Sequence, residues 1–111
     1  MSREMSDAVV VLTTIGAAAD AASLARTLVE ERLAACVNVL PAMASFYRWK
    51  GTVEQDREQQ LIIKTTAGRV AALESRLRAL HPYELPEFVV LGAEASAAYA
   101  AWLRDGTGAG G

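Results

Sequence analysis

The strongest constraint on the fold is that the spacing of apolar residues changes repeatedly along the chain. Residues 8–14 carry four consecutive apolar side chains, Val9 to Leu12, which is typical of a strand covered on both faces or placed at the centre of a sheet. From Asp20, the predicted N-cap, apolar residues recur at the spacing of an amphipathic helix. This change predicts a strand followed by a helix.

The same alternation returns later in the chain. Residues 36–40 have strand composition, Pro41 interrupts them as an edge or bulge residue does, and residues 45–49 resume the pattern. The clearest helical period follows, and it ends at His81 because Pro82 comes next. Its apolar positions are Val70, Leu73, Leu77 and Leu80. A further strand at 88–91 and a short helix at 96–103 complete the order.

The middle of the chain predicts an unusually long hairpin. Lys50 and Gly51 form its turn, and the return arm from Thr52 is polar up to Gln60 and apolar only from Leu61. Each arm is longer than a typical strand of about five or six residues. We therefore expect the tip to project beyond the core.

This order predicts an α+β fold, a ferredoxin-like βαββαβ sandwich with a long protruding β2-β3 hairpin and an extra C-terminal helix. In the usual strand order of that fold, 4-1-3-2, both main helices cover one face of the sheet. We expect an N-terminal tail over residues 1–7, a single domain over 8–104, and a flexible Gly-rich tail over 105–111.

A monomer with this fold would expose an apolar edge strand and aromatic side chains on the hairpin. The edge is the strand at 88–91, and an unpaired apolar edge normally needs cover. We therefore predict a homo-oligomer. The interface residues expected on the hairpin and at the edge are Phe46, Tyr47, Trp49 and Phe88.

Composition narrows the choice of partners and compartment. Eleven basic and thirteen acidic residues give a net charge of −2, which argues against nucleic acid, and no run is long enough to span a membrane. One cysteine excludes an intrachain disulfide framework and suits a cytoplasmic address. The run 8–19 resembles a signal peptide, because it is apolar and ends in small residues. However, the negative charges of Glu4 and Asp7 cancel the positive charge of Arg3 that such a leader needs, so a strand is favoured.

No familiar catalytic motif is present, and we predict that the protein is not an enzyme and that it requires no cofactor. Acylphosphatase chemistry occurs on this fold but uses an arginine after the first strand, where TTIGAAAD has none. Three residues could instead serve soft or borderline metals: Cys36, His81 and Glu84. Their ordinary alternatives are a buried small hydrophobe, a side chain on the helix dipole and a solvated carboxylate.

Five motifs in order along the chain resemble the CutA family of divalent-cation tolerance proteins. They are RTLVEERLAACVN (26–38), SFYRWKG (45–51), LIIKTT (61–66), HPYELPE (81–87) and AYAAWL (98–103). The resemblance implies a ferredoxin-like subunit in a homotrimer whose hairpins wrap around neighbours. It also implies a link to divalent cations, with copper(II) as a possible ligand and no established catalytic activity.

Mapped onto this sequence, the metal-associated positions of the family are Cys36 and His81, with Glu84 and Glu87 near. Some members carry a further cysteine at the end of the first strand, where this chain has Thr13 or Thr14.

A rival hypothesis comes from the similarity of such trimers to PII signalling proteins. It is a small-molecule sensor with its ligand in an intersubunit cleft. The residues expected around that ligand are Lys64, Tyr83, Trp49 and Arg48. A third hypothesis is a stable scaffold whose metal contacts are incidental.

Overall fold

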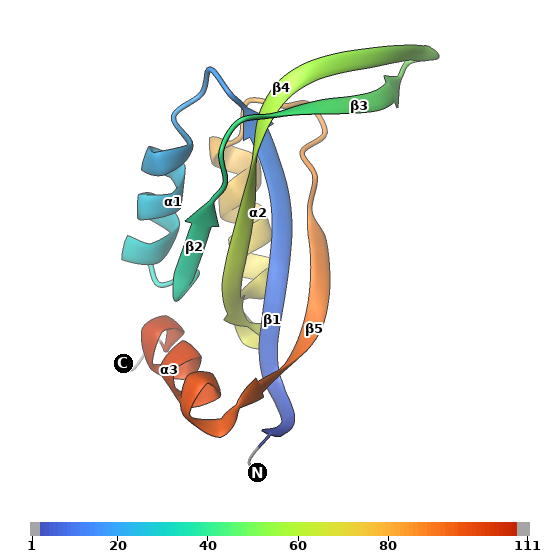
Figure 1. Cartoon of the computed structure of the whole chain (residues 1–111). Helices are drawn as coiled ribbons and strands as arrows, with labels where there is room; N and C mark the ends of the chain where they lie inside the picture. Colours follow the sequence, from blue (N-terminus) through green and yellow to red (C-terminus); the bar gives the residue numbers. More distant parts are fainter. Residues whose placement is uncertain (1–2, 109–111) are drawn as a thin grey trace.

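The computed structural model describes residues 3–108, with side chains from Asp7 onward. The elements in chain order are β1 (Arg3–Gly16), α1 (Ala21–Glu30), β2 (Cys36–Val39), β3 (Met43–Trp49), β4 (Thr52–Thr66), the 3₁₀ turn η1 (Ala67–Arg69), α2 (Val70–Leu80), β5 (Val89–Ser96) and α3 (Ala97–Thr107). Figure 1 shows the strands as an elongated, twisted sheet, with the β3–β4 hairpin bending away at one end and α3 lying at the other. None of the helices within residues 3–108 is both long and apolar enough to cross a membrane.

The strand order confirms the ferredoxin-like prediction. The main path is β2-β4-β1-β5 and all its pairs are antiparallel, while β3 pairs only with β4. Because β2 and β3 together form the second strand of the predicted unit, the path is the predicted order 4-1-3-2. The break between them falls at residues 40–42, which include Pro41.

Both main helices pack on the same face of the sheet. Val11 of β1 lies opposite Ile63 of β4, and both are fully buried. They share one core cluster with Leu28 of α1 and with Leu73 and Leu77 of α2. This shared cluster explains why the helical periods were strong: each apolar stripe faces the same two central strands.

Among the described residues, the opposite face is covered by a helix only at one end, where Thr66 contacts Thr107 of α3, and we call it the open face. Side chains alternate along each strand, so the cross-strand rows on this face follow from the register. Those rows are Cys36–Lys64–Val10–Leu91 and Asn38–Ile62–Leu12–Val89. Leu91 and Val89 are 47% and 44% exposed, so the face is apolar and uncovered toward the β5 edge.

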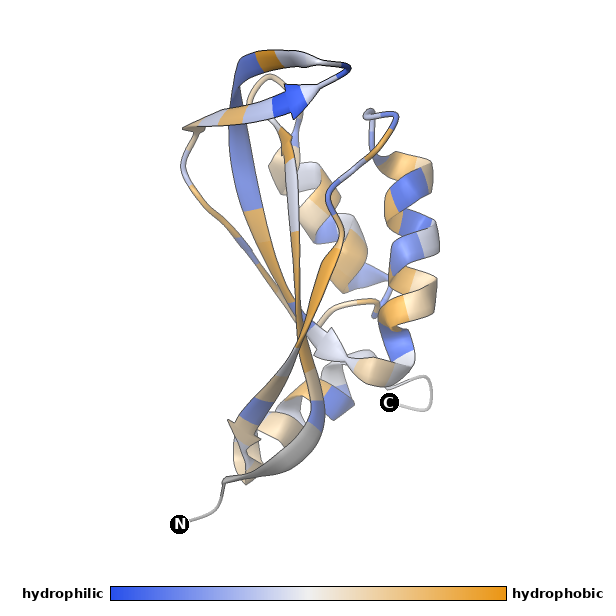
Figure 2. Ribbon diagram, turned by 90° about the vertical axis from the view of Figure 1, so that its right-hand side faces the viewer, coloured by the Kyte–Doolittle hydropathy of each residue, from blue (hydrophilic) through white to orange (hydrophobic). Residues whose placement is uncertain are grey.

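The hairpin turns as predicted at Lys50 and Gly51. Both residues have positive φ, 51° and 82°, the backbone that a tight two-residue hairpin turn requires. Figure 2 shows β4 changing from hydrophilic in the hairpin to hydrophobic within the sheet. The polar half of β4 therefore lies outside the core.

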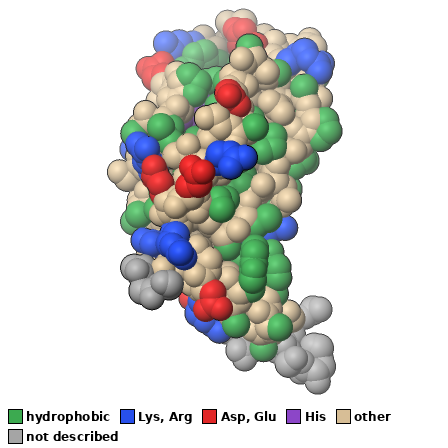
Figure 3. All heavy atoms as spheres, turned by 90° about the vertical axis from the view of Figure 1, so that its left-hand side faces the viewer, with side chains coloured by type: hydrophobic (Ala, Val, Ile, Leu, Met, Phe, Trp, Pro, Cys, Tyr) green, Lys and Arg blue, Asp and Glu red, His purple; other side chains and the backbone are tan. Residues whose placement is uncertain are grey.

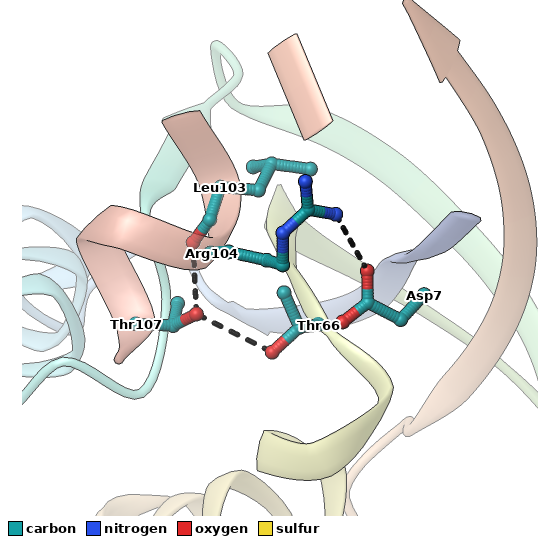
Figure 4. A network of polar contacts seen from close by, with 5 residues as sticks. All are labelled: Asp7, Thr66, Leu103, Arg104 and Thr107. Atoms are coloured by element: carbon teal, nitrogen blue, oxygen red, sulfur yellow. Dashed lines mark hydrogen bonds and ion pairs between the residues drawn. The ribbon is translucent and has the colours of Figure 1, made fainter. Parts of the chain in front are cut away.

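Two local contacts fix the ends of the helices. Asp20 caps α1, since its Oδ1 accepts a hydrogen bond of 2.9 Å from the backbone N–H of Ser23. At the other end of the molecule, Thr107 of α3 donates to the carbonyl of Leu103 and contacts Thr66 at 3.3 Å (Figure 4). An ion pair joins the same helix to β1: Arg104 lies 3.4 Å from Asp7.

The first strand and the last helix extend beyond the residues expected for them. The strand expected from residue 8 begins at Arg3, and Arg3 to Met5 pair with residues 94–96 of β5. The last helix, expected at 96–103, runs to Thr107, so it includes the first part of the expected tail. Residues 1–2 and 109–111, also assigned to tails, lie outside the described residues.

Candidate functional site

The hairpin leans over the loop that joins α2 to β5 and encloses a cleft between them, which we call the hairpin cleft. Its volume is about 1040 Å³. The lining combines aromatic side chains with four carboxylates. The aromatic residues are Tyr47, Trp49 and Tyr83, with Phe46 at the edge. The carboxylates belong to Asp56, Glu58, Glu84 and Glu87.

Strand alternation explains why these groups face one another. Tyr47 and Trp49 are two residues apart on β3, and Asp56 and Glu58 are two residues apart on β4. Residues two positions apart on a strand point to the same side of the hairpin. Ser45 lies opposite Asp56, which places the aromatic and acidic residues on the same side. Phe46, 68% exposed, alternates to the other side and reaches the cleft only at its rim.

Two tyrosine hydroxyls donate to carboxylates in the cleft. The Tyr47 hydroxyl bonds Asp56, and the Tyr83 hydroxyl donates to Glu58 at 2.7 Å. The hydrogen bond to Asp56 raises the pKa of Tyr47 to about 12. Partial burial and the bond to Glu58 raise the pKa of Tyr83 above its usual value. Both hydroxyls therefore remain protonated donors at neutral pH.

His81 lies behind the cleft and is 7% exposed. Its Nε2 lies 2.6 Å from the carbonyl oxygen of Thr14, and its Nδ1 accepts a hydrogen bond of 3.1 Å from the backbone N–H of Tyr83. This pattern assigns the neutral tautomer that carries its proton on Nε2. Both ring nitrogens are engaged by backbone groups, so coordination of a metal requires one of these bonds to break.

Cys36 lies elsewhere, on the open face beside Lys64. Its thiol is half-buried, 3.9 Å from Oδ1 of Asn38. Lys64, the neighbour of Cys36, pairs with Val10 of β1. His81 bonds to Thr14 of the same strand, and four residues of a strand separate Val10 from Thr14 by about 13 Å. Cys36 and His81 thus do not meet within one subunit. In the part of the chain that the structure describes, no three His, Cys, Asp or Glu side chains are grouped to hold a metal.

The remaining acidic candidates lie on the loop before β5. Glu84 is exposed at the cleft mouth, with Oε1 3.9 Å from the ammonium of Lys50. Glu87 lies deeper and accepts a hydrogen bond of 3.0 Å from Gln60. The two carboxylates therefore face the cleft from different depths.

The four residues expected around a small-molecule ligand do not share one pocket. Trp49 and Tyr83 line the hairpin cleft together. Lys64 instead lines a second pocket of about 380 Å³ against β5 and α3. Arg48 alternates to the outer side of the hairpin, away from Trp49.

The expected interface residues also differ in their surroundings. Phe46 shares the outer side of the hairpin with Val53, which is 63% exposed. Phe88, in contrast, packs against the core cluster. Figure 3 shows the α1 side of the molecule, where acidic and basic side chains are intermixed. The exposed large apolar residues on the strands lie on the hairpin and on β5, with Val39 on β2 in addition.

Asp56 and Glu58 were not among the predicted site residues. The sequence did contain a signal, because Glu54, Asp56 and Glu58 recur at every second position of a predicted strand. That spacing puts three carboxylates on one side of the hairpin. The sequence analysis predicts only a polar arm at these positions.

Comparison with known proteins identifies the family. A family model described as "CutA1 divalent ion tolerance protein" matches residues 9–106. The chain belongs to the CutA1 family. A relative from Thermus thermophilus named "Divalent-cation tolerance protein CutA" is 49% identical over 100 residues, covering 89% of this chain and 97% of that protein. The human "Protein CutA" is 44% identical over 88 residues, and this chain spans only 49% of its length.

Solved structures of the CutA1 family share the fold. The Thermus thermophilus Cut A1 structure has a TM-score of 0.86 and 48% identity, covering 91% of this chain and 99% of that one. CutA from Synechococcus elongatus has a TM-score of 0.87 and 39% identity, with 96% of each chain covered. The resemblance inferred from the five motifs is confirmed.

Proposed function

We propose that the protein acts in divalent-cation tolerance as a homotrimer that binds divalent metal ions, copper(II) among them, without a catalytic role. The observation that carries this proposal is the 49% identity, over 89% of the chain, to a protein named for divalent-cation tolerance. A cytoplasmic location accords with the single cysteine.

The uncovered apolar surface supports self-association. Val89, Val90 and Leu91 of the edge strand are 43–47% exposed, and Phe46 and Val53 of the hairpin are 68% and 63% exposed. These residues belong to two separate elements, the β5 edge and the hairpin. A closed ring of subunits buries two different surfaces at each contact, as one subunit's hairpin meets the next subunit's sheet.

In this proposal Cys36 is the copper ligand, with Glu84 and His81 as the further candidate ligands. Its sulfur is a soft donor and is partly accessible on the open face. Since Cys36 and His81 lie apart in one chain, a site that uses both would have to draw them from different subunits. Their roles are therefore best tested separately.

Native mass spectrometry with and without copper(II) tests assembly and metal binding together. We expect a trimer that takes up a defined number of ions per subunit. Cys36→Ser should remove that uptake while the trimer persists, and Val39→Ser, a partly exposed position on the same strand, is the matched control. Unchanged uptake by Cys36→Ser would reject the cysteine site, and a monomer would reject the assembly.

A second candidate function is small-molecule sensing in the hairpin cleft. The observation that favours it is that Trp49 and Tyr83, two of the residues expected at such a site, line one cleft. A thermal-shift screen tests it: a ligand that stabilises the protein should lose its effect on Trp49→Leu. The Lys64→Ala variant should have no effect on a ligand of this cleft, because Lys64 lines the other pocket.

A further inference from the structure

The hairpin cleft has a strong negative charge bias. Its lining contains four carboxylates and, among the described residues, no lysine or arginine. Arg48 and Arg57 of the hairpin alternate to the outer side. The four carboxylates would repel a negatively charged effector such as a nucleotide.

The aromatic lining adds a second property of the cleft. Trp49, Tyr47 and Tyr83 contribute rings to its walls. Aromatic faces beside carboxylates form the usual recognition site for organic ammonium groups. A volume of about 1040 Å³ suits an extended molecule better than a single ion.

The chain itself places an ammonium at the mouth of this cleft. Lys50 Nζ lies over the Trp49 ring, 5.5 Å from its centroid, and 3.9 Å from Glu84 Oε1. Lys50 belongs to the hairpin turn, and its side chain is 72% exposed. The contact shows that this wall accepts a primary amine by a cation–π contact and an ion pair.

The carboxylates lie on both walls of the cleft. Asp56 and Glu58 lie on the hairpin, while Glu84 and Glu87 lie on the facing loop. Each of Asp56 and Glu58 accepts a bond from a tyrosine hydroxyl and, as a carboxylate, keeps further lone pairs. The acceptors are thus distributed along the cleft, as a linear polycation requires.

We propose that the hairpin cleft is a binding site for a linear aliphatic polyamine, whose terminal ammonium groups lie against Trp49 and the carboxylates Asp56 and Glu84. Lys50 occupies the outermost part of this site and competes with the ligand. The site is distinct from the copper ligand proposed at Cys36.

Isothermal titration of the full-length protein with spermidine, a linear triamine, tests the proposal at low ionic strength, where charge interactions are least screened. We expect saturable binding, weakened about tenfold by Asp56→Asn with Glu84→Gln, because two close charge pairs are lost. The matched control, Glu30→Gln with Asp105→Asn, removes the same charge far from the cleft and should weaken binding less than about twofold. Equal weakening in both double variants would show general charge attraction and overturn the proposal.

A variant with the opposite sign sharpens the test. Lys50→Gln removes the competing ammonium and should tighten spermidine binding about threefold. Arg26→Gln removes the same charge from α1 and should leave binding nearly unchanged. No tightening by Lys50→Gln beyond that of Arg26→Gln would contradict the assignment of Lys50 to the site.

The remaining outcomes identify other ligands or none. Absence of spermidine binding up to about 1 mM overturns the proposal. Displacement of spermidine by equimolar Mg²⁺ would assign the cleft to a hard divalent ion instead. Native mass spectra of the same samples report the trimer and copper uptake, so failure here is separable from failure of the proposed function.

Discussion

His81→Ala tests whether the only histidine holds the structure or a metal. In the native protein its ring bridges the carbonyl of Thr14 and the backbone N–H of Tyr83, at 2.6 and 3.1 Å. The site is 7% exposed, so the substitution leaves both backbone groups poorly hydrated. A buried polar group without a partner costs about 1–3 kcal/mol, and partial entry of water lowers the sum, which gives a loss of about 2–4 kcal/mol.

The assay is guanidinium unfolding at one fixed protein concentration, because assembly makes stability concentration-dependent. His81→Gln is the informative companion, since its side-chain amide can still donate to the Thr14 carbonyl. We expect it to recover about half of the lost free energy. A loss below about 0.5 kcal/mol for His81→Ala would refute the structural role. Removal of copper uptake at temperatures where the variant remains folded would instead assign the ring to the metal.

Two further predictions concern the cleft and the open face. Tyr83→Phe should lower stability by about 1 kcal/mol at pH 7, because Glu58 loses a hydrogen bond. The folded pKa of Tyr83 is raised, so its contribution is complete below about pH 10 and is lost at higher pH. Urea unfolding from pH 8 to 11 should therefore show a shallower alkaline decline in the variant, and parallel curves would contradict this. Leu91→Lys should shift the native mass toward the monomer, whereas Val29→Lys, a similarly exposed position on α1, should leave the trimer intact; equal effects would argue against the open face as an interface.

Most of the topology could be predicted because each element carried its own local signal. The helical stripe through Leu73 and Leu77 and the apolar run at Val9 to Leu12 both reflect burial against one core. The extent of β1 could not be predicted, since its first residues pair with the Glu94–Ser96 end of β5. Neither segment is rich in β-branched residues, and pairing between distant segments leaves no periodic trace in either.

The site was harder to predict than the fold for a related reason. Sequence analysis selected unusual residues, Cys36 and His81, one by one, but the strand register separates them. The cleft instead depends on which side of a strand each residue occupies and on how the hairpin bends over the following loop. Only the first of these, the alternation that unites Asp56 with Glu58, can be deduced from spacing.

The unequal lengths of the strand pairings also bear on the order of folding. From Thr52 to Asp56, β3 is the only strand in the described chain that pairs with β4, whereas from Glu58 onward β4 also pairs with β1. A two-stranded ribbon alone is at best marginally stable in water. The inner sheet can therefore form by a first-order process within one subunit, while in the proposed trimer consolidation of the hairpin would depend on protein concentration. Backbone amides at the tip should gain protection from hydrogen exchange only as subunits associate. Their exchange rates therefore measure the extent of assembly.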